Sequence, residues 1–362
     1  MITASAGYGG GPQHVYDLAL SLGKKALVNI ACPKQFPFFD RFKEAIEGDI
    51  IEIPERRFML KYAWRLTVFT RKNGIEIIHS HGKGASLYGR FVSAITGIPL
   101  IHTPHGIHID QYGYLMRAIY LGYEYCTGWI DRKKIFVSYS EFSHALKLRI
   151  ARSLNSVVIF NGVSSSGTIE WKTSTRARIR SELGVNNHEV IIATLSRFDY
   201  AKNMHEMVKI AKLSSNLKFW FLGDGEDFNH IRSSILINHL DHVWLPGFVN
   251  MPLEYLAAAD IYLSTSRWEG LPLAVLQAMS LSKPVVASEV NGNKDVVHHG
   301  LTGYLYPLGE PQIASDYIHH LAKDKYLRES IGERGLSLQK SVFNIDQMSK
   351  LTFDVYKDSL SK

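Results

Sequence analysis

The sequence predicts an α/β fold built from two consecutive units of parallel strands and helices. Short aliphatic and β-branched runs alternate with longer amphipathic segments along most of the 362 residues. A chain of this length, 46% hydrophobic and 21% charged, has enough apolar material for two cores. The alternation stops near the turn Asn161–Gly162 and then resumes. We therefore predict two doubly wound, Rossmann-like domains that face each other across a cleft.

The strands expected in the first domain are short and separated by segments with helical spacing. They cover residues 25–31, 75–79, 100–103, 135–138 and 157–160. Helical spacing is clearest over residues 14–22 and 85–95. Residues 1–5 have the composition of the end of a strand whose beginning is missing.

The second domain is expected to begin after a crossover segment. Residues 161–187 are rich in Ser, Thr and Arg and show weak periodicity. Strands are then predicted at residues 190–195, 219–222, 261–264 and 284–287. The predicted domains are residues 1–165 and 166–345, followed by a helix over 346–362 that crosses back to the first domain.

Charge is divided unevenly between the two halves. Residues 1–165 contain 20 Lys and Arg against 12 Asp and Glu, whereas the remaining residues contain 21 basic and 22 acidic residues. The first half is therefore expected to face an anionic partner.

Two cysteines without metal-type spacing favour a reducing compartment, and no long uncharged apolar run predicts a membrane span. The predicted location is the cytoplasm.

A glycine cluster and several histidines follow the predicted strands of the first half. The string Gly7-Tyr8-Gly9-Gly10-Gly11-Pro12 leads into a helix, where backbone amides can approach a phosphate or sugar, or where the loop is simply permissive. The absence of GxGxxG spacing argues against a nicotinamide or flavin dinucleotide. The histidines at positions 79, 81, 102, 105 and 108 allow a metal cluster, but without neighbouring carboxylates we favour hydrogen-bonded pocket residues, with His105 best placed.

Basic and acidic residues follow the predicted strands of the second half. Arg197 and Lys202 lie in one strand–helix loop, where two cations can reach a diphosphate, although a solvated pair is the ordinary alternative. Glu269 precedes a Gly–Pro turn and a helix that begins near Leu273. A carboxylate there can accept hydrogen bonds from sugar hydroxyls, and the helix amides can bind phosphate oxygens.

Several strings in fixed order resemble a known family. They include YGGGPQHV, IIHSHGKGA, TPHG, LSRFDYAKN, LPGFV and EGLPLAVLQAMSLSKPVVAS, and they span nearly the whole chain. Together they resemble the retaining GT-B-fold glycosyltransferases of family four, also called glycosyl transferases group 1, of the bacterial surface-polysaccharide type. The family signature is a Glu followed eight positions later by a second Glu, and here the second position is Gln277.

The resemblance implies roles for particular residues. Arg197 and Lys202 would neutralise the donor diphosphate, Glu269 would hold the transferred sugar, and His105 would line the cleft as a fourth catalytic residue. Gln13 would lie on the acceptor side, and Glu206 matches a less certain position. The implied donor-binding residues are Gly9, Gly10, Gly247, Phe248, Val249, Gly270, Leu271, Leu273 and Gln277.

The resemblance and the charges predict retaining, metal-independent transfer of a sugar from a nucleoside diphosphate, by default UDP, to a glycan or polyprenyl-linked glycan. No Asp-x-Asp motif is present, and two cations with a helix N-terminus can absorb the charge that grows on the leaving group. Gln277 can accept from a ribose hydroxyl but lacks the carboxylate charge, a loss of about 1 kcal/mol. A catalytically degenerate scaffold and a GT-B nucleotide-sugar epimerase are the alternatives.

A basic amphipathic segment gives the first half a second expected partner. Arg57, Lys61 and Arg65 share one helical stripe, and Phe58, Tyr62, Leu66 and Phe69 share another. Such a helix can lie on an anionic membrane, or its apolar stripe can pack on the sheet. We weigh the two interpretations equally. A nucleic-acid partner is not expected, because no recognition motif accompanies the charge.

Overall fold

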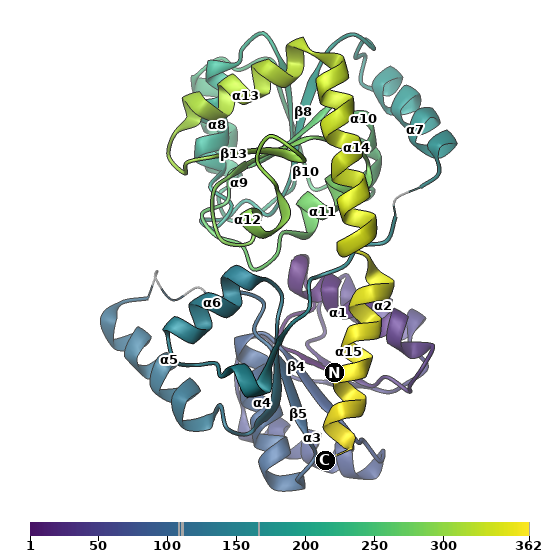
Figure 1. The fold of residues 1–362 in the computed structure, drawn as a ribbon, viewed down its shortest axis with the longest axis vertical. Helices are drawn as coiled ribbons and strands as arrows, with labels where there is room; N and C mark the ends of the chain where they lie inside the picture. The colour runs from purple at the N-terminus through teal and green to yellow at the C-terminus, as the bar shows by residue number, and fades with distance from the viewer. Residues whose placement is uncertain (108, 110–111, 166, 362) are drawn as a thin grey trace. The chain divides into compact units, whose positions relative to one another are not determined.

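The computed structural model describes residues 1–107, 109, 112–165 and 167–361, so His108 lies outside the described residues. Contacts divide the chain into two compact units. Unit 1 comprises Met1–Gly162 and Ile345–Lys362, and unit 2 comprises Val163–Asn344. The chain therefore crosses between the units twice, and its last helix belongs with the first unit in Figure 1.

Unit 1 is built on a seven-stranded parallel sheet with the order β3-β2-β1-β4-β5-β6-β7. Its register is set by pairs such as Ile2 with Ser80 and Ile101 with Lys133. The strands are β1 (Ile2–Thr3), β2 (Ile30–Cys32), β3 (Ile50–Glu52), β4 (Ile78–His81), β5 (Leu100–Thr103), β6 (Asp131–Phe136) and β7 (Ser156–Val158).

Helices cover both faces of this sheet (Figure 1). They are α1 (Gly10–Gly23), α2 (Phe38–Ala45), α3 (Leu60–Lys72), α4 (Lys83–Thr96), α5 (Tyr114–Thr127), α6 (Tyr139–Lys147) and α15 (Ile345–Leu360), with a 3-10 turn at Ser153–Asn155. Helix α15 packs beside α1, and helix α3 packs beside α4. Leu18 and Leu22 of α1 share one core with Met348 of α15, which explains why the C-terminal helix belongs to this unit.

Two predicted strands of unit 1 begin later than the sequence suggests. Residues 25–29 and 75–77 are apolar enough to form strands, yet pairing starts only at Ile30 and Ile78. Both stretches flank the amino end of β1, which pairs with its neighbours through Ile2 and Thr3 alone. A strand needs a hydrogen-bonded neighbour, so these flanking residues stay irregular. The paired part of β4 therefore includes His79 and His81.

Unit 2 is built on a six-stranded parallel sheet with the order β10-β9-β8-β11-β12-β13. Its strands are β8 (Ile191–Leu195), β9 (Lys218–Leu222), β10 (Val243–Gly247), β11 (Ile261–Ser264), β12 (Val285–Ser288) and β13 (Gly303–Tyr306). The four central strands are nearly all buried, as expected of a parallel sheet with helices on both faces. The edge strands β10 and β13, like β3 of unit 1, are only half-buried, which explains why the apolar pattern did not reveal them.

The helices of unit 2 include one that the sequence does not predict. They are α7 (Ile169–Glu182), α8 (Met204–Leu213), α9 (Phe228–Ile237), α10 (Pro252–Ala258), α11 (Leu273–Ser280), α12 (Asn293–Val296), α13 (Pro311–Lys323) and α14 (Lys325–Val342). The predicted crossover is confirmed, because the chain passes from unit 1 to unit 2 at Gly162–Val163, but residues 169–182 of this weakly periodic segment form helix α7. Polar contacts hold this helix: buried Arg180 donates to Asp260 and to the Ala258 carbonyl, so apolar periodicity is weak.

The strand orders locate one switch point in each sheet. Ligands of doubly wound sheets bind at the carboxyl ends of the strands where the order reverses. In unit 1 the reversal falls between β1 and β4, and in unit 2 between β8 and β11. The loops that follow these strands carry the glycine cluster, Arg197, Lys202 and Glu269, and His81 is the last residue of β4. Among the described residues, no helix has the length and hydrophobicity to cross a membrane.

Candidate functional site

Lys202 and Glu269 form an ion pair at the switch point of unit 2. The Lys202 Nζ atom lies 2.5 Å from Glu269 Oε1, and the Ser266 hydroxyl donates to the same oxygen at 2.6 Å. The two side chains are 23% and 12% exposed, so each remains reachable by a ligand. The loops after β8 and β11 thus bring together a cation and a carboxylate that are 67 positions apart in the sequence.

A network of hydrogen bonds fixes the loop that carries Lys202. The Thr265 hydroxyl donates to the Lys202 and Asn203 carbonyls at 2.9 and 3.1 Å. The Arg267 guanidinium donates to Asn203 Oδ1 at 2.7 Å and to the Tyr200 carbonyl at 3.1 Å. Asn203 adopts a left-handed conformation with φ of 53°, which this network stabilises. The position of Lys202 is therefore set by the loop after β11.

Arg197 is the more exposed of the two predicted cations. Its side chain is 46% exposed, and its Nη2 atom lies 2.9 Å from Asp199 Oδ2. The pairing holds the guanidinium beside the Lys202 loop, because the Asp199 carboxylate also accepts from the Lys202 amide at 3.1 Å. The structure therefore brings Arg197, Lys202 and Glu269 to one edge of the sheet.

The turn after Glu269 is closely packed and leads into helix α11. Gly292 has φ of +85°, and a Cβ atom on it would lie 2.7 Å from Glu269 Cβ and 2.9 Å from the Gly270 carbonyl oxygen. The buried residues Gly270, Leu271 and Leu273 then bring the chain into the helix, which begins at Leu273 as predicted. Pro272 at the N-cap has no polar side chain, so first-turn amides remain for a ligand. Gln277 lies one turn into α11 and is half-buried.

The implied donor-binding segment 247–249 begins at the last residue of β10. Gly247 is buried with φ of +80°, and its carbonyl accepts from the Gly223 amide at 2.9 Å. Phe248 is 45% exposed and Val249 is half-buried, so an apolar surface is available at this edge. Gly223 and Gly225 allow the neighbouring loop to pass against the backbone at Ser196 and Phe198.

Glu206 lies in the core beneath the Lys202 loop. It is 7% exposed, accepts from Asn203 Nδ2 at 2.7 Å and accepts from the Gly309 amide at 3.2 Å. These contacts make Glu206 a support for the left-handed Asn203.

In unit 1, the glycine cluster turns the chain from β1 into α1. Gly9 is the N-cap with φ of 154°, and Gly10 is the first helical residue. Gln13, in the first turn, donates to Asp17 at 2.8 Å. Burial raises the pKa of Asp17 to about 6, and the bond from Gln13 opposes that shift. Gly9, Gly10 and Gln13 therefore share one end of α1.

The four described histidines that were predicted as pocket residues, together with His14, which was not predicted, fall into two groups according to their hydrogen bonds. His79 contacts the Tyr356 hydroxyl at 2.7 Å and the Thr103 hydroxyl at 2.8 Å, while His102 contacts the Ser80 hydroxyl at 3.0 Å. His14, His81 and His105 instead pack on one another, and His81 Nδ1 lies 3.1 Å from His105 Nε2. Two buried ring nitrogens, His14 Nδ1 and His81 Nε2, have no hydrogen-bond partner among the described residues.

Burial keeps this histidine group neutral near neutral pH. Desolvation lowers the pKa of His14 to about 4 and lowers the pKa of His79, His81 and His105. Within the described part of the chain, His14, His81 and His105 form the one group that could hold a metal, with ligand atoms within 4.8 Å of one another. Three neutral imidazoles are ligands that Zn²⁺ accepts, and no carboxylate joins them.

The turn that carries His105 is held from below by Glu141. His105 adopts φ of 58°, and the adjacent Gly106 amide donates to one Glu141 oxygen. The other Glu141 oxygen accepts from the Val137 amide at 2.9 Å. This carboxylate is 4% exposed and fixes the backbone on which the imidazole sits.

The basic amphipathic segment, for which the sequence left membrane contact and packing on the sheet both open, is divided by the structure. Helix α3 begins at Leu60, so Arg57 precedes it, while Lys61 and Arg65 lie on its exposed face. The apolar stripe is not free: Leu66 is buried, and Tyr62 and Phe69 pack against the unit 1 core. The sheet-packing interpretation therefore accounts for this stripe, and only Phe58, which precedes the helix, is exposed.

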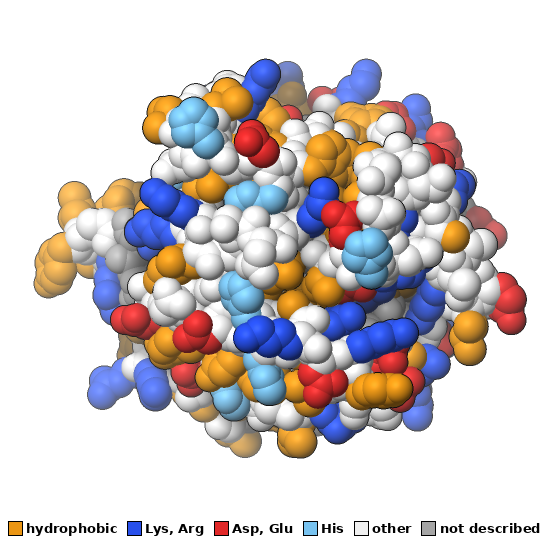
Figure 2. All heavy atoms as spheres, turned by 90° about the horizontal axis from the view of Figure 1, so that it is seen from above, with side chains coloured by type: hydrophobic (Ala, Val, Ile, Leu, Met, Phe, Trp, Pro, Cys, Tyr) orange, Lys and Arg blue, Asp and Glu red, His pale blue; other side chains and the backbone are white. Residues whose placement is uncertain are grey.

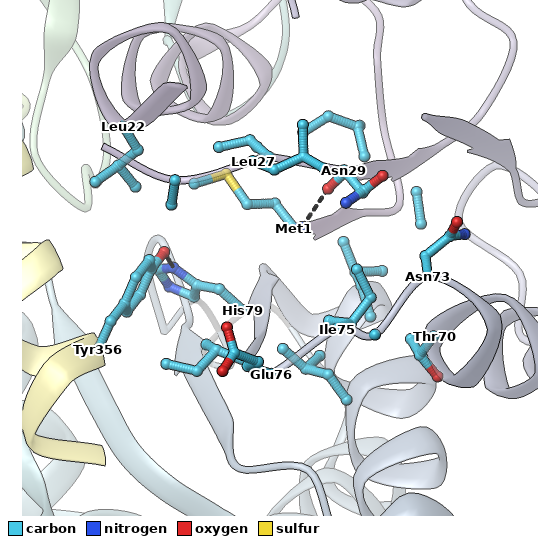
Figure 3. A pocket seen from close by; sticks show the side chains of 18 of the residues that line it. Met1, Leu22, Leu27, Asn29, Thr70, Asn73, Ile75, Glu76, His79 and Tyr356 are labelled. Carbon is cyan, nitrogen blue, oxygen red and sulfur yellow. Dashed lines mark hydrogen bonds between the residues drawn. The ribbon is translucent and has the colours of Figure 1, made fainter. Parts of the chain in front are cut away.

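Unit 1 also contains a cavity with mainly apolar walls (Figure 3). Met1, Leu27, Ile75 and His79 line it, beside the amino ends of the strands. The Met1 ammonium donates to the Asn29 carbonyl at 2.6 Å, and burial lowers the pKa of that ammonium to about 5. Because ligands of parallel sheets bind at the carboxyl ends, this cavity is not the switch-point site.

Several residues that organise the site could not be found from motif spacing. Asn203, Thr265, Ser266 and Arg267 fix the Lys202–Glu269 pair, and Gly292 closes on Glu269. A weak signal existed for Gly292, since it precedes a helix in the string NGNKDVV. The others are ordinary polar residues whose partners lie more than 60 positions away, except Ser266.

The fold and the polar switch points define a class of protein, the GT-B glycosyltransferases. Solved structures support the fold: HepE from Anabaena, in complex with UDP and glucose, matches with a TM-score of 0.86 at 18% identity, covering 98% of each chain. A sucrose-phosphate synthase from Thermosynechococcus elongatus also matches with a TM-score of 0.86 at 17% identity, covering 99% of this chain and 98% of that one.

Family models and curated relatives identify the particular family. The model of glycosyltransferase family 4 matches residues 8–166, and the model of glycosyl transferases group 1 matches residues 175–337. The UDP-Gal:alpha-D-GlcNAc-diphosphoundecaprenol alpha-1,3-galactosyltransferase of Escherichia coli is 24% identical, covering 83% of this chain and 81% of that protein. The capsular polysaccharide biosynthesis glycosyltransferase CapM of Staphylococcus aureus is 24% identical, covering 79% and 77%. The chain belongs to the family 4, group 1 glycosyltransferases, and it is a glycosyltransferase.

Proposed function

We propose that this enzyme transfers a sugar from a nucleoside diphosphate, with uridine as the base, to a glycan or polyprenyl-diphosphate-linked glycan. The product belongs to a cell-surface polysaccharide such as capsule, O-antigen or lipopolysaccharide. The observation that carries the proposal is the Lys202–Glu269 pair beside the start of α11. The names of the relatives from Escherichia coli and Staphylococcus aureus, and the UDP complex of HepE, support the donor and acceptor classes.

The proposed reaction is retaining and uses no metal. The bond from the anomeric carbon to the phosphate oxygen breaks, and its electron pair stays on the diphosphate. The acceptor hydroxyl oxygen bonds to the anomeric carbon on the same face, and its proton passes to the departing phosphate oxygen. Lys202, Arg197 and the first amides of α11 stabilise the growing negative charge, while Glu269 accepts hydrogen bonds from the sugar.

A screen of nucleotide sugars tests this function. The purified chain is mixed with UDP-, GDP- and ADP-linked sugars, and thermal stability and nucleotide release are both measured. Stabilisation and slow release with a UDP-sugar support the proposal. Stabilisation without release, in the presence of glycan acceptors as well, would support a degenerate scaffold, and no stabilisation by any donor would contradict the donor site.

We further propose that unit 1 contacts an anionic membrane, which would bring the enzyme to a lipid-linked acceptor. The excess of 20 basic over 12 acidic residues in residues 1–165 supports electrostatic attraction, and Lys61 and Arg65 are exposed. The triple variant Arg57→Gln, Lys61→Gln and Arg65→Gln should reduce binding to phosphatidylglycerol vesicles. A matched control neutralises Lys209, Lys212 and Arg232 of unit 2. Unchanged binding of the first variant would count against contact through this segment.

A further inference from the structure

Helix α5 of unit 1 presents an apolar face to solvent. Leu115 is 70% exposed and Trp129, just beyond the helix, is 74% exposed. The other large side chains exposed by more than half are Tyr114, Met116, Ile119 and Tyr125. Over most of the face drawn in Figure 2, hydrophobic side chains are instead interspersed with charged ones. The number of exposed apolar side chains on one short helix therefore requires an explanation.

These residues form one stripe along the helix. Leu115, Ile119, Gly122 and Cys126 follow at intervals of three and four positions, the spacing of a single helical face, and all four are exposed. The Trp129 indole continues the stripe, because its Nε1–H donates to the Cys126 carbonyl at 2.8 Å. The stripe is thus a defined surface with an aromatic residue fixed at its carboxyl end.

The opposite face anchors the helix so that this stripe must point outward. Glu124 is 4% exposed and lies 2.9 Å from Arg90 and 3.1 Å from Lys134. Tyr120 and Leu121 pack against the apolar cluster around Phe136. Rotating the stripe inward would remove the buried carboxylate from both cations, which is strongly unfavourable.

The exposed face carries no charge. The two residues of α5 that are charged at neutral pH are Arg117, which is half-buried, and Glu124, which is buried. Exposed basic residues follow on the same unit, with Arg132 three positions after Trp129. An uncharged apolar strip on a strongly basic unit complements a membrane surface, which offers hydrocarbon below anionic headgroups.

We infer that the α5 stripe inserts into the headgroup region of an anionic membrane. Tyr114 and Trp129 lie at its two ends, and such aromatic residues favour the boundary between hydrocarbon and water. A second copy of this chain is a poorer occupant, because a dimer through α5 would bring two basic units together. The inference deepens the proposed function, since it rests on an acceptor held in a membrane. It assigns the insertion to α5, because Tyr62, Leu66 and Phe69 of α3 pack on the core and the exposed apolar residues of α3, Leu60, Trp64 and Val68, alternate with the charged Lys61 and Arg65.

Vesicle binding tests the inference on the full chain. The double variant Leu115→Gln, Ile119→Gln should lower partitioning onto phosphatidylglycerol–phosphatidylcholine vesicles by about tenfold or more, because two apolar side chains lose their burial. The control variant Ile169→Gln, Ile237→Gln changes two isoleucines of unit 2 that are 79% and 75% exposed, and it should bind as the unmodified chain does. Equal binding by all three proteins would overturn the assignment.

A label on Cys126 provides a second measurement. Cys126 is exposed and Cys32 is buried, so a thiol-reactive environment-sensitive dye reacts at the stripe. Its emission should shift to the blue with anionic vesicles and change little with phosphatidylcholine alone. If the emission does not shift although the labelled protein is bound to vesicles, insertion of the stripe is contradicted. If the unmodified chain forms a dimer and binds no vesicles, and the α5 variant is a monomer, the stripe is a self-association surface. UDP-induced thermal stabilisation is measured in parallel, so that a failure of the donor proposal is recognised separately.

Discussion

The Lys202 ammonium lies 2.5 Å from the Glu269 carboxylate, although the two residues follow different strands of unit 2. The pairing satisfies both charges before any donor arrives, and Ser266 supplies a further hydrogen bond to the carboxylate. A bound diphosphate would give Lys202 a second anionic partner, while Glu269 could turn its remaining lone pairs to sugar hydroxyls. In the proposed function, the pair would therefore link recognition of the phosphate to recognition of the sugar.

Removing either cation should slow the release of nucleotide from the sugar donor. Arg197→Ala and Lys202→Ala each delete a charge-assisted contact of about 1.5–3 kcal/mol, which corresponds to roughly 10- to 100-fold in rate. Steady-state nucleotide release measures the effect. Lys212→Ala, at an exposed lysine of α8, should leave the rate unchanged. Full activity in both site variants would show that these cations do not bind the diphosphate.

Substituting Gly292 should displace Glu269. A Cβ atom there would lie 2.7 Å from Glu269 Cβ, and the backbone has φ of +85°. We expect Gly292→Ala to lower donor turnover as well as stability. Gly300→Ala is a matched control, because Gly300 has φ of +75° but no atom within 4 Å of the added carbon. If both variants lose the same activity, backbone strain rather than contact with Glu269 is responsible.

Restoring the second signature carboxylate should strengthen donor binding. Gln277→Glu adds a charged acceptor one turn into α11, and we expect a gain of about 1 kcal/mol, or about fivefold in the dissociation constant of UDP. Calorimetry with UDP measures it, and Gln277→Ala gives the opposite change. Weaker binding by the carboxylate variant would show that Gln277 does not face the ribose.

Chelation should not affect turnover. The proposed mechanism assigns stabilisation of the leaving group to Arg197, Lys202 and the α11 amides, so EDTA should leave nucleotide release unchanged. Metal analysis of the protein before and after EDTA treatment examines the His14, His81 and His105 group directly. A loss of activity that Zn²⁺ or Mg²⁺ restores would refute the metal-free mechanism.

Stability should fall as the pH drops from about 6.5 toward 4. Burial lowers the pKa of His14 and of His102 to about 4 in the folded chain, so the unfolded chain binds more protons in this window. Asp17, with a pKa raised to about 6, opposes this trend, but the five histidines whose pKa is lowered outnumber it. Urea midpoints across this range measure the effect, which should be smaller in the double variant His14→Gln, His102→Gln. A urea midpoint that stays constant across this pH range would mean that protonating these imidazoles does not destabilise the folded chain.

Much of the fold followed from local pattern. Strands β5 and β11 occupy the predicted residues, and α11 begins at the predicted Leu273, because buried parallel strands and apolar helices have strong periodicity. Helix α7 was missed because polar contacts such as Arg180 with Asp260 hold it, and the edge strands β3, β10 and β13 were missed because they are only half-buried. The remaining edge strand, β7, was predicted from its aliphatic run. Strands β2 and β4 begin late because pairing depends on a neighbour that local sequence does not describe.

The sequence by itself determined the family, the two-unit α/β class and the loops that carry charge, because motif order and strand–helix alternation are properties of the chain. The tertiary structure decided which side chains meet: Lys202 with Glu269, Gly292 against Glu269, and His14 with His81 and His105. It also decided that Tyr62, Leu66 and Phe69 of α3 face the core, whereas Leu60, Trp64 and Val68 of α3 and the stripe of α5 face solvent. Both helices carry apolar residues on more than one face. Which of these residues face solvent depends on which face of each helix packs against the rest of unit 1.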